Sequence, residues 1–275
     1  MTEVATNGEL LLVGCGNMGR AMLQGWLAAG FLHPDKVHVV EPAEALRAEA
    51  AALGVRTYAS AEALDSGFRP ATVVLAVKPQ VMAAVLPAYR SHVTESVVVS
   101  IAAGIPVSLL ETGLGDVAAV RAMPNTPAAI GKGSTVIFAN ERVSPEQAER
   151  VARLLSAGGA VHPVEREALI DAATALSGSG PAYVFHFIEG LAEAGVQLGL
   201  PPQTALALAR ETVFGAGALA MAADTSPAEL RRQVTSPGGT TEAALHVFTD
   251  NNALQTLLVQ AAAAAYRRAV ELADT

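Results

Sequence analysis

Two different hydrophobic patterns divide the chain. In the first part, short runs of apolar and β-branched residues alternate with stretches in which apolar residues recur at helical spacing. The short runs are apolar throughout, which is typical of parallel strands buried on both faces of a sheet. This order predicts an α/β fold with a doubly wound parallel sheet. The predicted strands are 10–13, 37–41, 72–77, 97–102, 117–123 and 135–139, with a short one near residue 161. The predicted helices between them are 18–29, 43–53, 81–89, 107–112 and 145–157.

From about Glu165 onward the strand signals stop and alanine- and leucine-rich helical patterns follow. We therefore predict an α/β domain over 1–164 and an all-helical domain over 165–275. The long helices are apolar on more than one face, which favours burial against a second subunit. The alternative is a self-contained bundle. The predicted helices of this part are 166–176, 181–198, 202–222, 227–233, 240–249 and 252–272.

Composition narrows the class of protein. A net charge of −8 and a pI near 5.3 argue against a general nucleic-acid binder, because phosphate contacts need a basic surface. The single cysteine, Cys15, cannot form an intrachain disulfide, which is typical of a reducing cytoplasm. The first ten residues lack the pattern of a secretory signal, and no apolar run predicts a membrane span. The six histidines have no ligand-like spacing, so we predict no metal site. These features together predict a cytoplasmic protein.

A glycine-rich turn follows the first predicted strand. Residues 14–19 read Gly-Cys-Gly-Asn-Met-Gly and open a helix, as in the dinucleotide-binding unit of Rossmann folds. The first glycine allows the tight turn, the second lets the backbone approach a pyrophosphate, and the third allows close helix–strand packing. The alternative for Cys15, a redox role instead of a small filler, needs a lowered thiol pKa.

Glu41 stands at the end of the second predicted strand, where an acidic side chain accepts hydrogen bonds from an adenosine ribose and repels a 2′-phosphate. This favours NAD over NADP, although Arg47 in the next helix is placed to reach a phosphate. The alternative role of Glu41 is to cap that helix.

Further motifs end other strands or begin helices. The segments around Lys78, Ala102 and Asn125 lie at the predicted carboxyl edge of the sheet, where open α/β folds bind ligands. Residues 177–181, Ser-Gly-Ser-Gly-Pro, indicate either an anion site or close backbone packing at a helix start. Residues 235–242, Thr-Ser-Pro-Gly-Gly-Thr-Thr-Glu, place four hydroxyl residues around two glycines at another helix start. An ordinary cap needs only one of them, so the surplus favours binding of a small carboxylate.

Taken in order, the glycine turn, AVKPQ, SIAAG, MPNTP, SGSGPAY and TSPGGTT resemble pyrroline-5-carboxylate reductases over nearly the whole chain, from Leu10 to about Arg268. The resemblance implies NADPH- or NADH-dependent reduction of 1-pyrroline-5-carboxylate to L-proline. It also implies a helical domain that forms a homodimer or a ring of dimers. It implies Thr241 as the catalytic residue, whose hydroxyl bonds the imine nitrogen. The substrate-binding residues are then Ser179, Ser236, Gly239, Thr240 and Thr241. The cofactor-binding residues are Gly14, Cys15, Gly16, Asn17, Met18, Glu41, Ala76, Val77, Lys78, Pro79, Ala102 and Asn125.

Two other interpretations remain at this point. A β-hydroxyacid dehydrogenase has a similar layout but uses a lysine on the interdomain helix, and this sequence has no lysine after Lys132. A non-catalytic dinucleotide sensor would keep the glycine turn but has no need for TSPGGTT or SGSGPAY.

Overall fold

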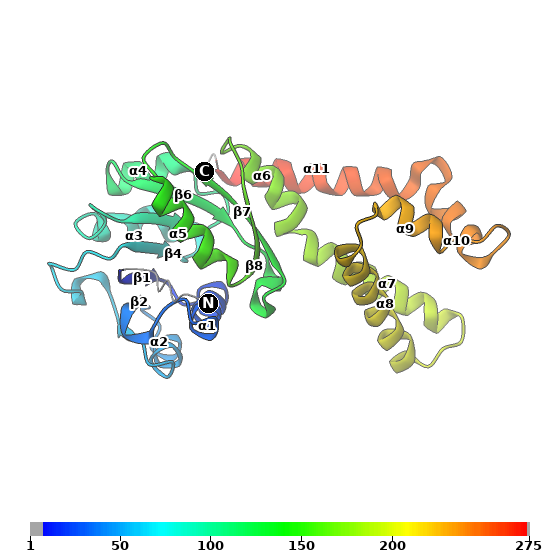
Figure 1. Ribbon diagram of the computed structural model, residues 1–275, viewed down its shortest axis with the longest axis horizontal. Helices are drawn as coiled ribbons and strands as arrows, with labels where there is room; N and C mark the ends of the chain where they lie inside the picture. Colours follow the sequence, from blue (N-terminus) through cyan, green and yellow to red (C-terminus); the bar gives the residue numbers. More distant parts are fainter. Residues whose placement is uncertain (1–7, 274–275) are drawn as a thin grey trace. The chain divides into compact units, whose positions relative to one another are not determined.

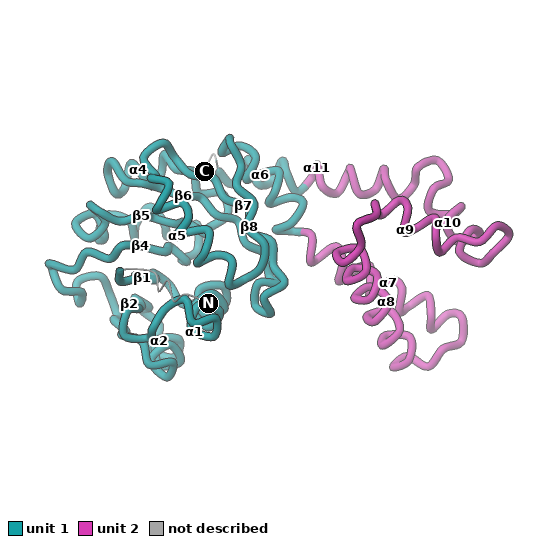
Figure 2. Tube along the Cα trace, viewed as in Figure 1, with its two compact units in different colours: residues 1–179, 265–275 teal, residues 180–264 magenta. Residues whose placement is uncertain are grey.

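The computed structural model describes residues 8–273, which form two compact units. One unit comprises residues 1–179 with 265–275, and the other comprises residues 180–264 (Figure 2).

An eight-stranded sheet forms the centre of the first unit (Figure 1). Its order is β3-β2-β1-β4-β5-β6-β7-β8, and all neighbours are parallel except β6 and β7. The predicted doubly wound sheet is thereby confirmed, with an antiparallel addition at one edge. The sequence pattern missed β3, because this strand has three residues that are all at least partly exposed and lacks a buried apolar run. The strands are β1 Leu10–Val13, β2 Val37–Val40, β3 Arg56–Tyr58, β4 Thr72–Leu75, β5 Val97–Ser100, β6 Ala118–Met123, β7 Gly133–Ala139 and β8 Gly159–Pro163.

Two apolar clusters cover the opposite faces of this sheet. Successive residues of a strand point to opposite faces, so Leu10 and Leu12 join one cluster while Leu11 and Val13 join the other. Burial on both faces explains why these strands carry no alternating polar positions. The helices of this unit are α1 Asn17–Ala28, α2 Glu44–Ala51, α3 Pro79–Val85, α4 Val107–Leu114, α5 Pro145–Ser156 and α6 Leu169–Ala173.

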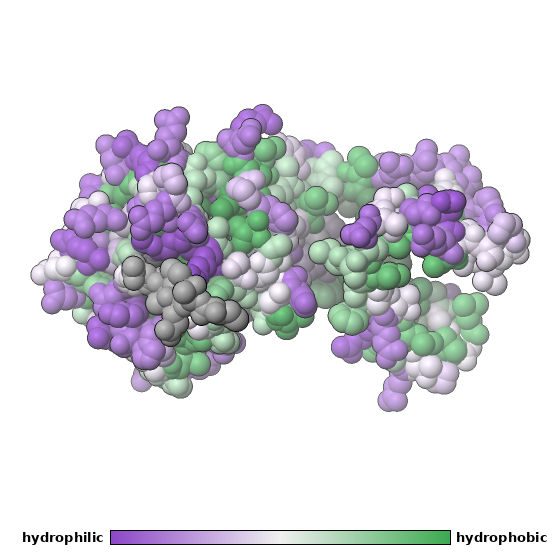
Figure 3. Space-filling model, in the orientation of Figure 1, coloured by the Kyte–Doolittle hydropathy of each residue, from purple (hydrophilic) through white to green (hydrophobic). Residues whose placement is uncertain are grey.

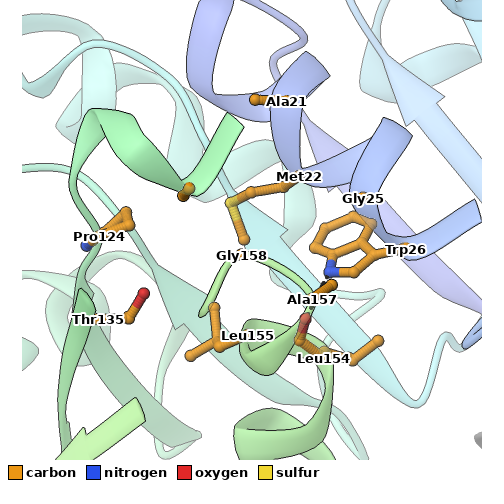
Figure 4. A pocket seen from close by; sticks show the side chains of 11 residues that line it. Ala21, Met22, Gly25, Trp26, Pro124, Thr135, Leu154, Leu155, Ala157 and Gly158 are labelled. Carbon is orange, nitrogen blue, oxygen red and sulfur yellow. Dashed lines mark hydrogen bonds between the residues drawn. The ribbon is translucent and has the colours of Figure 1, made fainter. Parts of the chain in front are cut away.

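Helix α1 packs closely on α5. The Trp26 indole is 1% exposed and donates a hydrogen bond to the Leu154 carbonyl at 2.8 Å. Figure 4 shows Met22 and Trp26 lining a small cavity together with Leu154 and Leu155. The cavity measures about 10 Å³, which is at most the space of one water molecule. It is therefore a packing gap and not a ligand site.

The second unit is entirely helical in its regular structure. Helices α7 Gly180–Gln197 and α8 Pro202–Ala222 lie side by side, and Gly195 allows their close approach because a Cβ there would be 3.0 Å from that of Ala205. Predicted bounds are confirmed for α8, for α9 Pro227–Gln233 and for α10 Thr240–Thr249. Helix α11, Ala253–Ala273, begins here and ends in the first unit.

The compact units divide the chain at 179/180, whereas the predicted boundary was 164/165. The two boundaries differ because the predicted one was placed where the strand pattern ends, whereas the compact units are separated by contacts in space. Residues 165–179 are helical or irregular but contact the sheet. Helix α6 is held to β6 by an ion pair between Arg121 and Asp171. The end of α11 lies so close to Gly104 that a Cβ on this glycine would be 2.9 Å from Leu272 atoms.

Among residues 8–273, one helix, α8, is long and apolar enough to cross a membrane by length and composition. A single such helix is weak evidence, because core helices pass the same test. Helix α8 also carries Arg210 and Glu211 near its middle, where charges in a bilayer are costly.

Candidate functional site

The glycine turn lies where three strands end. Gly14 has φ +88°, a conformation that favours glycine, and its N–H donates to the Val40 carbonyl at 2.8 Å. A Cβ on Gly14 would be 2.8 Å from the Ala76 carbonyl oxygen, and one on Gly19 would be 2.5 Å from the Gly14 carbonyl oxygen. The turn is therefore packed against β2, β4 and its own helix, and larger residues do not fit at either position.

Gly16 differs from these two glycines because a Cβ there would meet nothing within 4 Å. It is also the N-cap of α1, whose first turn has no side-chain cap and no acidic residue. The first N–H groups of α1, which begin at Asn17 and Met18, thus have no capping side-chain oxygen among the described residues and no acidic residue in their own turn. Such a helix start binds anions through its N–H groups and its dipole. These residues fit the pyrophosphate of a dinucleotide.

Glu41 connects the glycine turn to the next helix. One carboxylate oxygen accepts a hydrogen bond from the Cys15 N–H at 2.7 Å, and the other accepts from the Ala43 N–H at 2.9 Å. The side chain therefore does anchor the start of α2, as the alternative interpretation held. Each oxygen keeps a second lone pair, so the carboxylate can still accept from a ribose hydroxyl. Arg47 donates to the Glu41 and Pro42 carbonyl oxygens, which engages its guanidinium beside the same site.

The thiol of Cys15 is buried, and burial raises its pKa to about 11, with the charge of Glu41 acting in the same direction. A redox or nucleophilic role needs a thiolate near neutral pH. The structure therefore favours the interpretation of Cys15 as a small filler in the turn.

The other predicted cofactor residues follow β4 and β5. The Ala76 N–H donates to the Val13 carbonyl, and the Ile101 N–H donates to the Leu75 carbonyl, so these strand ends are neighbours. Val77 is partly buried, Lys78 is exposed at the N-cap of α3, and Pro79 is the first residue of that helix. Ala102 is buried just beyond β5. The structure thus brings residues 14–18, 41, 76–79 and 102 to one edge of the sheet.

Asn125 lies beyond β6 with both ends of its amide engaged. Its nitrogen donates to the Ser177 carbonyl at 3.1 Å, and its oxygen accepts from the Ser134 N–H at 2.9 Å. Its assignment to the cofactor stays a prediction. Ser179 ends a π-helical turn over Thr174–Gly178, and its N–H donates to the Thr174 carbonyl at 2.8 Å.

In the second unit, residues 236–239 form a tight loop before α10, and Thr240 and Thr241 are the first two residues of that helix. Gly238 has φ +70°, and its N–H donates to the Glu242 carboxylate at 2.7 Å. The Gly239 N–H donates to the Ser236 carbonyl at 3.0 Å, so this amide is used inside the loop. No side chain caps α10, although hydroxyl groups surround its start. An open groove of about 610 Å³ runs beside the loop, and its lining includes Thr235 and Glu242.

Among the described helices with an assigned N-cap, α10 lacks a side-chain cap, as do α1, α2, α3, α4, α6 and α8, whereas α5 and α9 have one. Ser144 caps α5 and Ser226 caps α9 by accepting a backbone N–H three residues on. At α10 neither Thr240 nor Thr241 does so, and Thr235 donates to the Arg231 carbonyl instead. The N–H groups at this helix start therefore lack a side-chain acceptor of the usual kind.

Sequence reasoning missed a buried charge network in the first unit. Arg121 of β6 has a side chain that is 3% exposed and contacts Asp171 at 2.6 Å and Glu167 at 3.4 Å. The available signal was an arginine inside an apolar strand, because such a charge needs a buried partner.

A Rossmann sheet with this glycine turn, an open helix start and an acidic residue after the second strand defines a nicotinamide-dependent oxidoreductase. A family model described as "NADP oxidoreductase coenzyme F420-dependent" matches residues 9–104, and one described as "Pyrroline-5-carboxylate reductase dimerisation" matches residues 167–272. The chain belongs to the pyrroline-5-carboxylate reductase family.

Individual relatives extend over the whole chain. The chain is 42% identical to a pyrroline-5-carboxylate reductase of Pseudomonas aeruginosa over 97% of both chains. A solved reductase from Coxiella burnetii matches with a TM-score of 0.90 at 38% identity, covering 98% of this chain and 99% of that one. The reductase of Plasmodium falciparum, solved with NADP bound, matches with a TM-score of 0.84 at 28% identity, covering 97% and 98%.

Proposed function

We propose that this chain reduces 1-pyrroline-5-carboxylate to L-proline with NADPH or NADH, the last step of proline biosynthesis, and that residues 236–241 bind the substrate. The observation that carries the site assignment is the uncapped start of α10, where hydroxyl residues are abundant and none caps the helix. The family of the chain supports the reaction, since full-length relatives bear this name.

The substrate carboxylate is assigned to the N–H groups at the start of α10, beginning at Thr240. The helix dipole favours an anion at this position. Gly239 contributes in another way, because its own N–H is committed to Ser236. A Cβ on Gly239 would be 2.9 Å from the Ser236 carbonyl oxygen, so glycine is what allows the loop to fold this tightly.

The Thr241 hydroxyl is assigned to the imine nitrogen. When bound, the nicotinamide supplies the hydride, and the residues 14–18, 41, 76–79 and 102 are those that would hold the cofactor. A cyclic imine is basic enough to be substantially protonated near neutral pH, so orientation and one hydrogen bond suffice. This accounts for a site without a strong histidine, lysine or glutamate acid–base signature.

The first test follows nicotinamide absorbance with 1-pyrroline-5-carboxylate, using NADPH and NADH in turn. Consumption with at least one cofactor is expected. Consumption with neither, while both bind, would favour the non-catalytic sensor.

The second test replaces the hydroxyl itself. Thr241→Ala is expected to lower kcat by about 100-fold, as for loss of one positioned hydrogen bond in a transition state, with cofactor affinity intact. Thr112→Ala is the matched control, because Thr112 is an exposed threonine of α4 in the first unit and its hydroxyl donates to the Ser108 carbonyl. Equal kcat values for the two variants would remove Thr241 from the mechanism.

The helical unit is proposed to form a homodimer, with rings of dimers as the larger assembly, in the cytoplasm. Supporting this, the matched dimerisation family covers residues 167–272. Large apolar side chains of this unit are exposed in the single chain, among them Phe214 at 77% and Met221 at 88%. Figure 3 shows hydrophobic residues (green) on the visible surface of this unit. Exposed apolar surface of this kind is typical of an interface. Sedimentation at micromolar concentration tests it, and a monomer would contradict it.

A further inference from the structure

Three residues on one side of β6 and its exit all contact the segment that leads to Ser179. Arg121, Met123 and Asn125 are spaced by two, which places their side chains on the same side of an extended chain. Arg121 pairs with Asp171, and Asn125 donates to the Ser177 carbonyl. Met123 packs so closely on Gly178 that a Cβ there would be 2.7 Å from the methionine methyl.

The partners on the other side follow one another along the chain. Glu167 lies just before α6, Asp171 lies within α6, and Ser177 and Gly178 belong to the π-helical turn that follows. An extended chain advances about 13 Å from Arg121 to Asn125. A helix advances about 9 Å over the six residues from Asp171 to Ser177. Contacts at both ends, Arg121 to Asp171 and Asn125 to Ser177, show that the two segments run alongside each other.

The far end of this contact is the π-helical turn over Thr174–Gly178. Such single turns are rare and often occur at functional sites. One extra residue in a turn rotates everything that follows by about 100° relative to a continuous α-helix. The turn therefore decides which way Ser179 faces, and whatever stabilises the turn also orients Ser179.

Asn125 lies two residues beyond the end of β6 and makes a hydrogen bond to that turn. Its oxygen is set by the Ser134 N–H of β7, which can only donate. Its nitrogen is thereby directed to the Ser177 carbonyl, which can only accept. The amide thus joins the exit of β6 to β7 and to the π-helical turn through two hydrogen bonds. An aspartate at this position would keep only the bond from the Ser134 N–H, and a hydrophobic residue of the same size would form neither bond.

We propose that Asn125 is a positioning residue for substrate: it fixes the π-helical turn against the end of β6 and through it orients Ser179. This rests on the proposed function, in which Ser179 contacts the substrate. It replaces the expectation that Asn125 contacts the cofactor.

The test compares Asn125→Ala with Asn140→Ala. Asn140 is a matched control at the other end of β6 and β7, where its amide oxygen accepts from the Ala119 N–H and its nitrogen donates to the Val117 carbonyl and to Glu111. We expect Asn125→Ala to lower kcat/KM for 1-pyrroline-5-carboxylate by about 10- to 100-fold. The Kd for NADPH stays within about twofold, and Asn140→Ala stays within about twofold in both measurements.

Asn125→Asp gives a second readout and decides the matter if the alanine variant does not fold. It keeps the acceptor for Ser134 but places an oxygen against the Ser177 carbonyl. Protonation of the carboxyl restores a donor. Its defect relative to the parent protein is therefore expected to shrink as the pH falls. A defect that is constant across pH would overturn the proposal.

Two further outcomes would overturn it. Equal losses in Asn125→Ala and Asn140→Ala would indicate a purely structural amide, and a weakened Kd for NADPH that accounts for the whole loss would make Asn125 a cofactor contact. Hydrogen exchange over residues 174–180 separates this from failure of the proposed function. Even if the parent protein does not reduce this imine, Asn125→Ala should speed exchange there, and unchanged exchange would refute positioning.

Discussion

Replacing Arg121 with methionine tests whether the charge network between β6 and α6 holds the first unit together. The guanidinium is 3% exposed and pairs with Asp171 and Glu167, whose side chains are 12% and 28% exposed. Its Nε is buried and has no partner among the described residues, so the network is not fully satisfied. Methionine keeps much of the volume and removes the charge, which leaves the Asp171 carboxylate nearly buried without a cation.

Breaking a buried pair by removing one partner costs about 3–5 kcal/mol, because the remaining charge is not compensated. Asp171 and Glu167 retain some access to water, so we expect about 3 kcal/mol for Arg121→Met, the lower end of this range. Removing both charges in Arg121→Met with Asp171→Leu should bring stability back to within about 1 kcal/mol of the parent protein. Arg142→Met is the control. Its pair with Asp116 is 50% and 84% exposed, and exposed pairs contribute about 0–1 kcal/mol.

The assay is urea unfolding followed by circular dichroism, with every variant at the same protein concentration because oligomer stability depends on it. The double-mutant cycle gives the coupling energy between Arg121 and Asp171. A loss below about 1 kcal/mol for Arg121→Met would show that the carboxylates rehydrate freely. A double variant as unstable as the sum of both single variants would refute the pair itself.

Two other predictions concern the cofactor edge. Glu41→Ser removes a carboxylate that would repel a 2′-phosphate, so the ratio of kcat/KM with NADPH to that with NADH should rise by about tenfold, the equivalent of about 1.4 kcal/mol; the same ratio in both proteins would contradict this. Because burial raises the pKa of Cys15 to about 11, only about one thiol in a thousand is ionised at pH 8. Iodoacetamide should therefore modify Cys15 in urea but not in the native protein, and fast native labelling would show the thiol to be accessible and ionised.

Much of the first unit follows from local pattern. The fully apolar runs at Leu10–Val13 and Thr72–Leu75 predicted strands buried on both faces, since each residue has an apolar layer to contact on its own side. The turn at Gly14 was predictable as well, because a strand, a glycine spacing and a helix in sequence constrain the backbone locally. The short edge strand β3 was not, because it carries no buried repeat.

The sequence by itself thus determined the sheet apart from β3, the long helices and the residues that gather at the carboxyl edge. Only the tertiary structure decided how polar side chains are used. Glu41 anchors the glycine turn as well as α2, and Asn125 joins the exit of β6 to β7 and to the π-helical turn. The partners of these side chains are distant along the chain, and local periodicity carries no information about them. The same holds for Arg121, whose partner lies 50 positions away. Long-range pairing of buried polar groups depends on which elements pack together, and that is settled only when the chain has folded.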